Sequence, residues 1–196
     1  PVTGEVATII EQEARAAGWD ANGAMMWKRV AAIESGGNCG PGATTGSYHG
    51  LYQLSHAGFR RLGGSDIYDC RQNARAAMKL AREFVAGFRH ETGRDPSPSE
   101  IYLAHQQGID GLAEHLRCPD CPAWQSMFRT AEYQRRGRAL AREAIWGNLS
   151  KSAQDRFGSV DNVTSAQFVE FWADRVEGRP KECRMVDGRV GLTRRL

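Results

Sequence analysis

The sequence predicts a single, mainly α-helical domain with one small Gly-rich loop or β-hairpin. The chain has 196 residues, which is enough for one well-buried core and short for two. In most segments apolar residues recur three and four positions apart, the spacing of amphipathic helices. One stretch, 36–50, is instead rich in Gly, Ser, Thr and Asn and has almost no apolar residues. We expect the domain to span 1–178 and residues 179–196, which lose hydrophobic density, to form a loosely packed C-terminal tail.

Two helices are expected to open the chain. Apolar residues from Val6 to Ala17 have helical spacing, and Gly18 then interrupts the pattern. The second helix carries Met26, Val30 and Ile33 on one face. It is expected to end at Glu34-Ser35, because Gly36-Gly37 follows directly.

The middle of the chain has clear helix boundaries. Ser55 is placed to cap a short helix through about Leu62, and Asn73–Arg89 is amphipathic and ends before Gly93. Ser97-Pro98-Ser99-Glu100 has the pattern of a capping box with proline at the first helical position. It opens a helix that we expect Gly108 to stop after Gln107. Further helices are expected at Trp124–Phe128, Ala131–Trp146 and Thr164–Val176.

Glu34 is the candidate general acid. It ends an apolar helical stretch, so partial burial and the negative end of the helix dipole would both raise its pKa. A raised pKa suits proton donation near neutral pH. The alternative is a solvated helix-end charge that Lys28 and Arg29 hold in the ionised form.

The composition is that of an ordinary globular protein. It is 41% hydrophobic and 25% charged, with a net charge of +3 and a pI near 8.8, which gives a mild preference for anionic partners. The arginines form scattered groups and no basic stripe with interleaved aromatics, which disfavours a nucleic-acid binder. No apolar run approaches the roughly 20 residues of a membrane span, so none is expected.

Five cysteines leave two interpretations open. His105, His115, Cys118 and Cys121 are four potential zinc ligands, but their spacing lacks the two tight pairs of a structural site. Disulfides are the favoured interpretation, and Cys39–Cys70 with Cys118–Cys121 is one pairing among those possible. We therefore expect no metal.

Three short segments in order carry a family resemblance: Glu34-Ser35-Gly36, Gly50-Leu51-Tyr52-Gln53 and Ala104-His105-Gln106-Gln107-Gly108. Together they resemble the lytic transglycosylases of the lysozyme-like superfamily, over roughly residues 20–146. The resemblance implies a goose-type, SLT-like lysozyme fold. Family members commonly carry Tyr-Asn where this chain has His105-Gln106, a variation similar to that of phage or secretion-associated members.

The resemblance also implies a reaction. Glu34 would protonate the glycosidic oxygen between N-acetylmuramic acid and N-acetylglucosamine. The same carboxylate would then accept the proton of the muramic C6 hydroxyl, which closes a 1,6-anhydro ring. The implied substrate-binding residues are Ser35, Gln53, Tyr102, His105 and Gln106, and no cofactor is implied.

Two other functions remain open. A goose-type-like lysozyme would hydrolyse the bond, and an inverting mechanism needs a second carboxylate about 6.5–9.5 Å away. Asp66 and Asp69 are the first acidic residues after Glu34, beyond a predicted helix. The third function is a catalytically silent glycan-binding scaffold.

The expected partners are peptidoglycan glycan strands and, with them, a secretion or phage apparatus. Four tyrosines are candidates for stacking on sugars: Tyr48, Tyr52, Tyr102 and Tyr133. The expected location is periplasmic or secreted, with an export leader that is not part of this chain.

Overall fold

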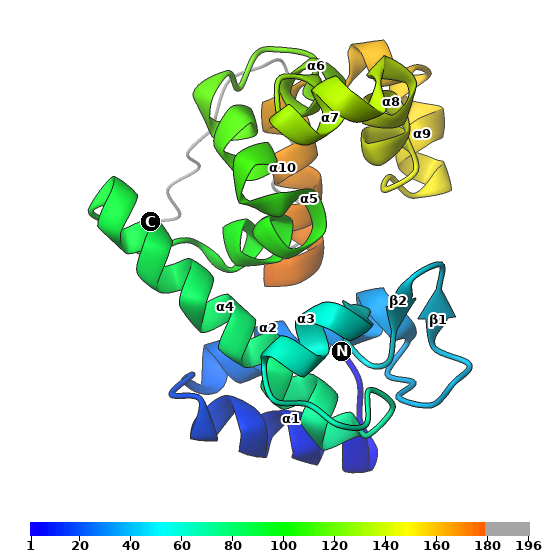
Figure 1. Cartoon of the computed structure of the whole chain (residues 1–196). Coiled ribbons are helices and arrows are strands. Elements are labelled where there is room, and N and C mark those ends of the chain that lie inside the picture. The colour runs from blue at the N-terminus through cyan, green and yellow to red at the C-terminus, as the bar shows by residue number, and fades with distance from the viewer. Residues whose placement is uncertain (179–196) are drawn as a thin grey trace, which may run out of the picture.

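The computed structural model describes residues 1–178, and within them the chain is mainly helical with one small antiparallel sheet. The N-terminal part comprises α1 (Gly4–Ala16), α2 (Ala21–Ser35), β1 (Thr44–Thr45), β2 (Tyr48–His49), β3 (Leu54–Ser55), α3 (His56–Arg61) and α4 (Cys70–Thr92). The C-terminal part comprises α5 (Pro98–Arg117), α6 (Ala123–Phe128), α7 (Ala131–Arg136), α8 (Arg138–Trp146), α9 (Lys151–Phe157), the 3₁₀ turn η1 (Val160–Asn162) and α10 (Ser165–Glu177). Figure 1 shows the two parts one above the other, with α4 running along their junction.

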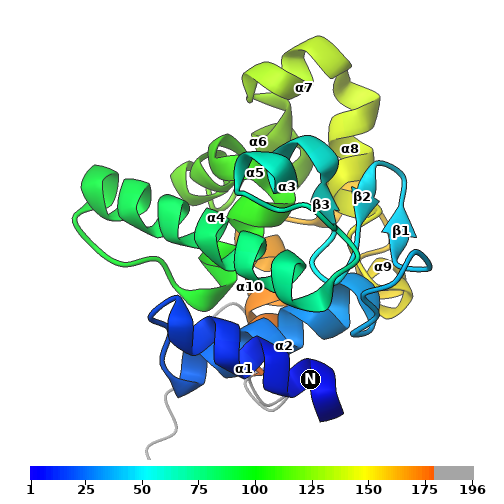
Figure 2. The same ribbon diagram turned by 60° about the horizontal axis from the view of Figure 1, so that its bottom comes forward.

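The two opening helices are confirmed. Helix α2 starts at the cap Asp20, whose side chain accepts a hydrogen bond from the Gly23 amide, and ends at Gly36 in the left-handed conformation. Met26, Trp27 and Val30 face the core, and Ile33 is half-buried. Helix α1 packs beside α2 and α4, as the view in Figure 2 shows.

The polar stretch 36–50 contains the predicted hairpin. β1 pairs with β2 and β2 with β3, all antiparallel, with Thr45 opposite Tyr48 and Tyr48 opposite Ser55. Gly50 follows β2 with φ +77, and a Cβ there would lie 2.4 Å from Asn73 Nδ2. This turn therefore requires glycine.

Two predicted helices differ in extent from the structure, and one helix was not predicted. Gly108 does leave the helical conformation (φ 75, ψ 162), but α5 resumes after it and runs to Arg117, because Leu112 and His115 anchor the second segment in the core. Gly137 (φ 96) divides the predicted helix 131–146 into α7 and α8. Helix α9 was not predicted, and its seven residues bury only Ala153.

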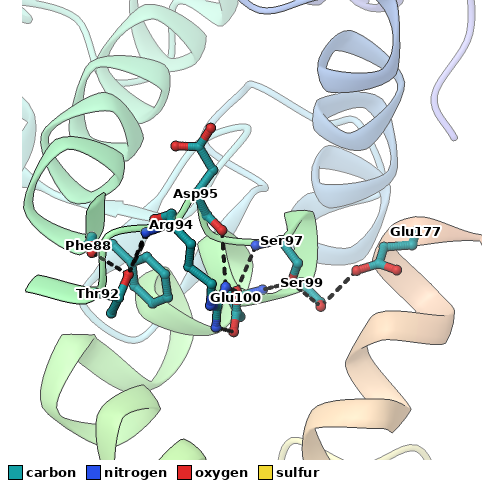
Figure 3. Close-up of polar contacts among 8 residues, drawn as sticks. All are labelled: Phe88, Thr92, Arg94, Asp95, Ser97, Ser99, Glu100 and Glu177. Carbon is teal, nitrogen blue, oxygen red and sulfur yellow. Dashed lines mark hydrogen bonds and ion pairs between the residues drawn. The ribbon is translucent and has the colours of Figure 1, made fainter. Parts of the chain in front are cut away.

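The start of α5 is fixed by a polar network that also reaches α10 (Figure 3). Ser97 and Glu100 form the predicted capping box, and Arg94 Nη2 lies 2.7 Å from Glu100 Oε1. Ser99 Oγ donates to Glu177 Oε1 at 2.9 Å. These contacts join the loop after α4 to the last described helix.

The cysteines pair as Cys39–Cys70 and Cys118–Cys121, while Cys183 lies outside the described residues. A disulfide leaves neither Cys118 nor Cys121 as a thiolate for zinc. The predicted tail, 179–196, also lies outside the described residues. Among the described helices, none combines the length and apolar character that a membrane crossing demands.

Candidate active site

A cleft of about 500 Å³ lies between the two parts of the molecule. The residues that line it come from α2, the sheet and the loop after it, α5, the turn before α9, and α10, whose ribbons Figure 1 shows. Its N-terminal wall carries Ile33, Glu34, Thr45, Tyr48 and Gln53. Its C-terminal wall carries Tyr102, His105, Gln106, Gly147, Asn148, Leu149, Ser150, Trp172 and Arg175.

Glu34 lies in the last turn of α2, in the position that the sequence predicts. Its carboxyl is shielded from water, and this desolvation raises its pKa. The charge of His105 and a weak hydrogen-bond interaction with the Tyr102 hydroxyl oppose the shift without reversing it. Glu34 therefore keeps its proton to a higher pH than an ordinary glutamate.

The alternative that Lys28 and Arg29 hold Glu34 ionised is wrong. Lys28 Nζ pairs with Glu11 at 2.6 Å. Arg29 Nη1 donates to the carbonyl of Glu177 at 2.7 Å, at the end of α10. Both cations thus point away from Glu34.

One face of α5 supplies three polar groups to the cleft. Tyr102 and Gln106 are one helical turn apart, and Gln106 Nε2 donates to the Tyr102 hydroxyl at 3.0 Å. This bond leaves the Tyr102 proton available to Glu34. His105 lies between them in sequence and is half-buried.

Gln53 holds the loop opposite α5. Its Nε2 donates to the carbonyls of Ala43 (3.0 Å) and Gly50 (2.9 Å), and its backbone has φ 49. Asn73, wholly buried on α4, fixes the same loop by accepting from the Tyr52 amide at 2.9 Å. With both Nε2 hydrogens used, Gln53 Oε1 is buried without a hydrogen-bond partner among the described residues.

The structure brings together six of the seven predicted site residues, and Ser35 is the exception. Ser35 Oγ donates to the backbone carbonyl of Leu51 at 2.9 Å and does not line the cleft. It ties the end of α2 to the Gly50 loop.

Two of the four candidate sugar-stacking tyrosines are not on the cleft wall. Tyr52 is wrong as a stacking residue because it is fully buried and donates to the Trp27 carbonyl at 3.0 Å. Tyr133 is half-buried on α7 and packs against the core. Tyr48 lines the cleft and is 54% exposed, and Tyr102 lines it while packing on Trp172 with ring centroids 5.0 Å apart.

Among the described residues that line the cleft, Glu34 is the only carboxylate. Asp66 accepts a hydrogen bond from the Tyr68 amide, and Asp69 caps α4 through the Gln72 amide. Neither aspartate lines the cleft, so neither is placed to activate water there.

Sequence reasoning missed the contribution of the last third of the chain. The 147–150 turn before α9 and two residues of α10, Trp172 and Arg175, complete the C-terminal wall. Trp172 Nε1 is buried without a hydrogen-bond partner among the described residues. The only signal was the aromatic face of the predicted helix 164–176, which by itself also fits a core helix.

No protein-family model matches the sequence, and no curated protein is significantly similar to it. The cleft offers one carboxyl with a raised pKa, a hydroxyl and an imidazole beside it, and side-chain amides on both walls. Such an arrangement can donate a proton to a polyhydroxylated ligand and take it back.

Proposed function

We propose that the chain is a lytic transglycosylase with a lysozyme-like fold. In this proposal it cleaves the β-1,4 bond between N-acetylmuramic acid and N-acetylglucosamine in peptidoglycan. The observation that carries the proposal is the position of Glu34, a carboxyl of raised pKa in a cleft whose described residues supply no second carboxylate. The three-segment sequence resemblance supports it, since Glu34, Gln53, His105 and Gln106 all reach this cleft.

In the proposed reaction Glu34 acts first as acid and then as base. The protonated carboxyl gives its proton to the glycosidic oxygen as the bond to C1 breaks. The resulting carboxylate, steadied by the Tyr102 hydroxyl, accepts the proton of the muramic C6 hydroxyl while O6 bonds to C1. The C6 hydroxyl is already part of the bound sugar, so its high effective concentration favours it over water.

The other cleft residues are assigned to binding. The Gln53 and Gln106 side-chain amides would hold sugar hydroxyl or N-acetyl groups, and Tyr48 would pack on an apolar sugar face. Two disulfides suit an oxidising compartment, which agrees with a periplasmic or secreted location. A secretion or phage apparatus remains the proposed setting.

Hydrolysis is the second candidate, because a lysozyme would use the same acid. It lacks support in the described cleft, where no carboxylate stands opposite Glu34 to activate water. A silent scaffold would not need a desolvated carboxyl, which is costly to bury. Hydrolysis would give reducing muramic ends, whereas a silent scaffold would release no products.

The decisive experiment is mass spectrometry of muropeptides after digestion of purified peptidoglycan in ¹⁸O-labelled water. We expect products that end in 1,6-anhydro-muramic acid, one water lighter than hydrolytic products and free of label. Reducing muramic ends carrying ¹⁸O at C1 would establish the lysozyme function instead.

Glu34→Gln should lower the rate of product release from peptidoglycan by at least about 100-fold. The exposed Glu83→Gln should keep the wild-type rate. Release by Glu34→Gln at the wild-type rate would refute the mechanism.

A further inference from the structure

Arg175 is the one permanently charged side chain among the described residues that line the cleft. Several other arginines among the described residues have a carboxylate partner, for example Arg75 with Glu13 and Arg142 with Asp161. No carboxylate among the described residues pairs with Arg175. A guanidinium without a partner beside a candidate active site has its donors available to an anionic ligand.

The Arg175 side chain rests on aromatic rings of its own helix. Its Cζ lies 5.4 Å from the ring centroids of both Phe171 and Trp172. Trp172 is 4% exposed and packs on Tyr102, so this support is itself fixed in the core. Stacking of this kind orients a planar guanidinium and reduces the entropy lost when it binds a ligand.

Arg175 lies close enough to Tyr102 for its charge to influence the Tyr102 hydroxyl. It lowers the pKa of the Tyr102 hydroxyl, although burial raises that pKa overall. The pKa of Glu34 remains raised because its carboxyl is desolvated. A ligand held by Arg175 would therefore lie in the same cleft as an acid that keeps its proton to higher pH.

We propose that Arg175 binds a carboxylate carried by the muramic residue of the substrate, an inference that rests on the proposed function. Of the two sugars in the strand, only N-acetylmuramic acid has an acidic substituent, the lactyl ether at O3. In a strand stripped of peptide the lactyl carboxylate is free. In an intact strand the lactyl group is amidated and the nearest carboxylates belong to the stem peptide. In both cases a guanidinium and a carboxylate form a charge-assisted, bidentate pair.

This contact makes Arg175 a specificity-determining residue. It favours strands that contain muramic acid over neutral chitin, in which every sugar lacks a carboxylate. Loss of one charge-assisted hydrogen-bonded pair should lower kcat/KM by about 10-fold to 100-fold. Because Glu34 is assigned the proton transfers and Arg175 only binding, the effect should fall mainly on KM, with kcat and its pH profile close to those of wild type.

The test compares Arg175→Gln with wild type on three substrates: intact strands, strands stripped by an amidase, and chito-oligosaccharides. A larger KM on stripped strands alone assigns the free lactyl carboxylate, and a larger KM on intact strands alone assigns the stem peptide. Arg175→Lys should recover part of the loss. Arg156→Gln is the matched control, since Arg156 also stacks on a neighbouring ring, that of Phe157, but lies outside the cleft. An equal loss on chito-oligosaccharides, or no change in KM, would overturn the proposal.

Calorimetric titration of stripped and intact strand fragments into Glu34→Gln and Glu34→Gln/Arg175→Gln separates this inference from the proposed function. Tighter binding by the single variant supports the Arg175 contact even if wild type cleaves nothing. Cleavage by wild type with identical affinities of the two variants would keep the function and reject the contact. If the fragments neither bind nor are cleaved, both proposals fail.

Discussion

At the scale of single residues, Glu34 shows a conflict between stability and the proposed activity. Its carboxyl is desolvated at the end of a helix, and both nearby cations on α2 are engaged elsewhere. His105 and the Tyr102 hydroxyl compensate the buried carboxylate only in part, so the folded state favours the protonated form. The property that makes Glu34 a useful acid is therefore one that weakens the fold as pH rises.

This conflict predicts that Glu34→Gln is more stable than wild type above the pKa of Glu34. A carboxyl whose folded-state pKa is raised contributes its stability below the unfolded-state pKa, and that contribution is lost as pH rises through the folded-state pKa. Glutamine has no such loss. Urea unfolding from pH 4 to pH 9 should show a stability gain for the variant that grows with pH. A gain that is constant across this range would mean that Glu34 does not titrate as a buried acid.

The residues of the site differ in how far the sequence alone could identify them. Glu34, Gln53 and Gln106 stand in short segments whose order along the chain could be recognised. Trp172 and Arg175 could not be identified in this way, because they reach the cleft only through the packing of α10 against α5 and α2. Tyr52 was wrongly predicted to stack on sugars. It stands in one of the recognisable segments, but the sequence does not show that its ring packs in the core.

At the scale of elements, most helices were predictable because their caps are local. Ser55, Ser97 and Thr164 each accept a backbone hydrogen bond at the start of the expected helix. Gly108 and Gly137 were harder, since glycine ends, kinks or divides a helix according to what packs on either side. The disulfide pairing was one of several that the sequence allows, and the folded loops decide it.

The two disulfides should differ in their effect on stability and activity. Cys39 and Cys70 are 31 residues apart, and Cys118 and Cys121 only three. On chain-entropy grounds, removing them should cost about 3–4 and about 2 kcal/mol respectively. Only the first bond anchors the segment between Glu34 and the sheet, so Cys39→Ser/Cys70→Ser should also lower kcat/KM. Denaturation and strand cleavage would measure both effects, with Cys118→Ser/Cys121→Ser as control. Equal activity losses in the two variants would contradict this role.

His115 should make the contact of α5 with α6 and α10 sensitive to acid. Its ring is 1% exposed, its Nδ1 lies 2.9 Å from Ser165 Oγ, and burial lowers its pKa to about 4. In the unfolded chain His115 binds a proton near pH 6.5, whereas in the fold it stays neutral to about pH 4. The free energy of unfolding therefore falls as pH is lowered from 6.5 to 4. At about 1.4 kcal/mol per pKa unit the loss is about 3 kcal/mol.

The check is His115→Phe, which keeps an aromatic ring without a titratable proton, and Ser165 retains its contact with Ser126. The free energy of unfolding should fall less between pH 7 and pH 4 in this variant than in wild type. His56→Phe, at an exposed position, should keep the wild-type slope. An unchanged slope in His115→Phe would show that His115 is protonated in the fold.

At the scale of the whole molecule, Arg29 connects the two sides of the cleft. It belongs to α2, which carries Glu34, and donates to the carbonyls of Val176 (3.4 Å) and Glu177 (2.7 Å) at the end of α10. Helix α10 in turn carries Trp172 and Arg175. A cation at a helix C-terminus satisfies free carbonyls and the helix dipole. We therefore expect Arg29 to help set the distance between α10 and the candidate acid.

Arg82 offers a matched comparison, because it makes the same kind of contact within the N-terminal part alone. Its guanidinium donates to the carbonyls of Ala17 (Nε, 2.8 Å) and Gly18 at the end of α1. Arg29→Gln and Arg82→Gln should each lower the free energy of unfolding by about 1–3 kcal/mol. Only Arg29→Gln should raise KM for glycan strands and speed amide hydrogen exchange in α10, because only there does the lost contact span the cleft. If both variants kept the wild-type KM and the wild-type rate of amide hydrogen exchange in α10, Arg29 would stabilise the fold without setting the width of the cleft.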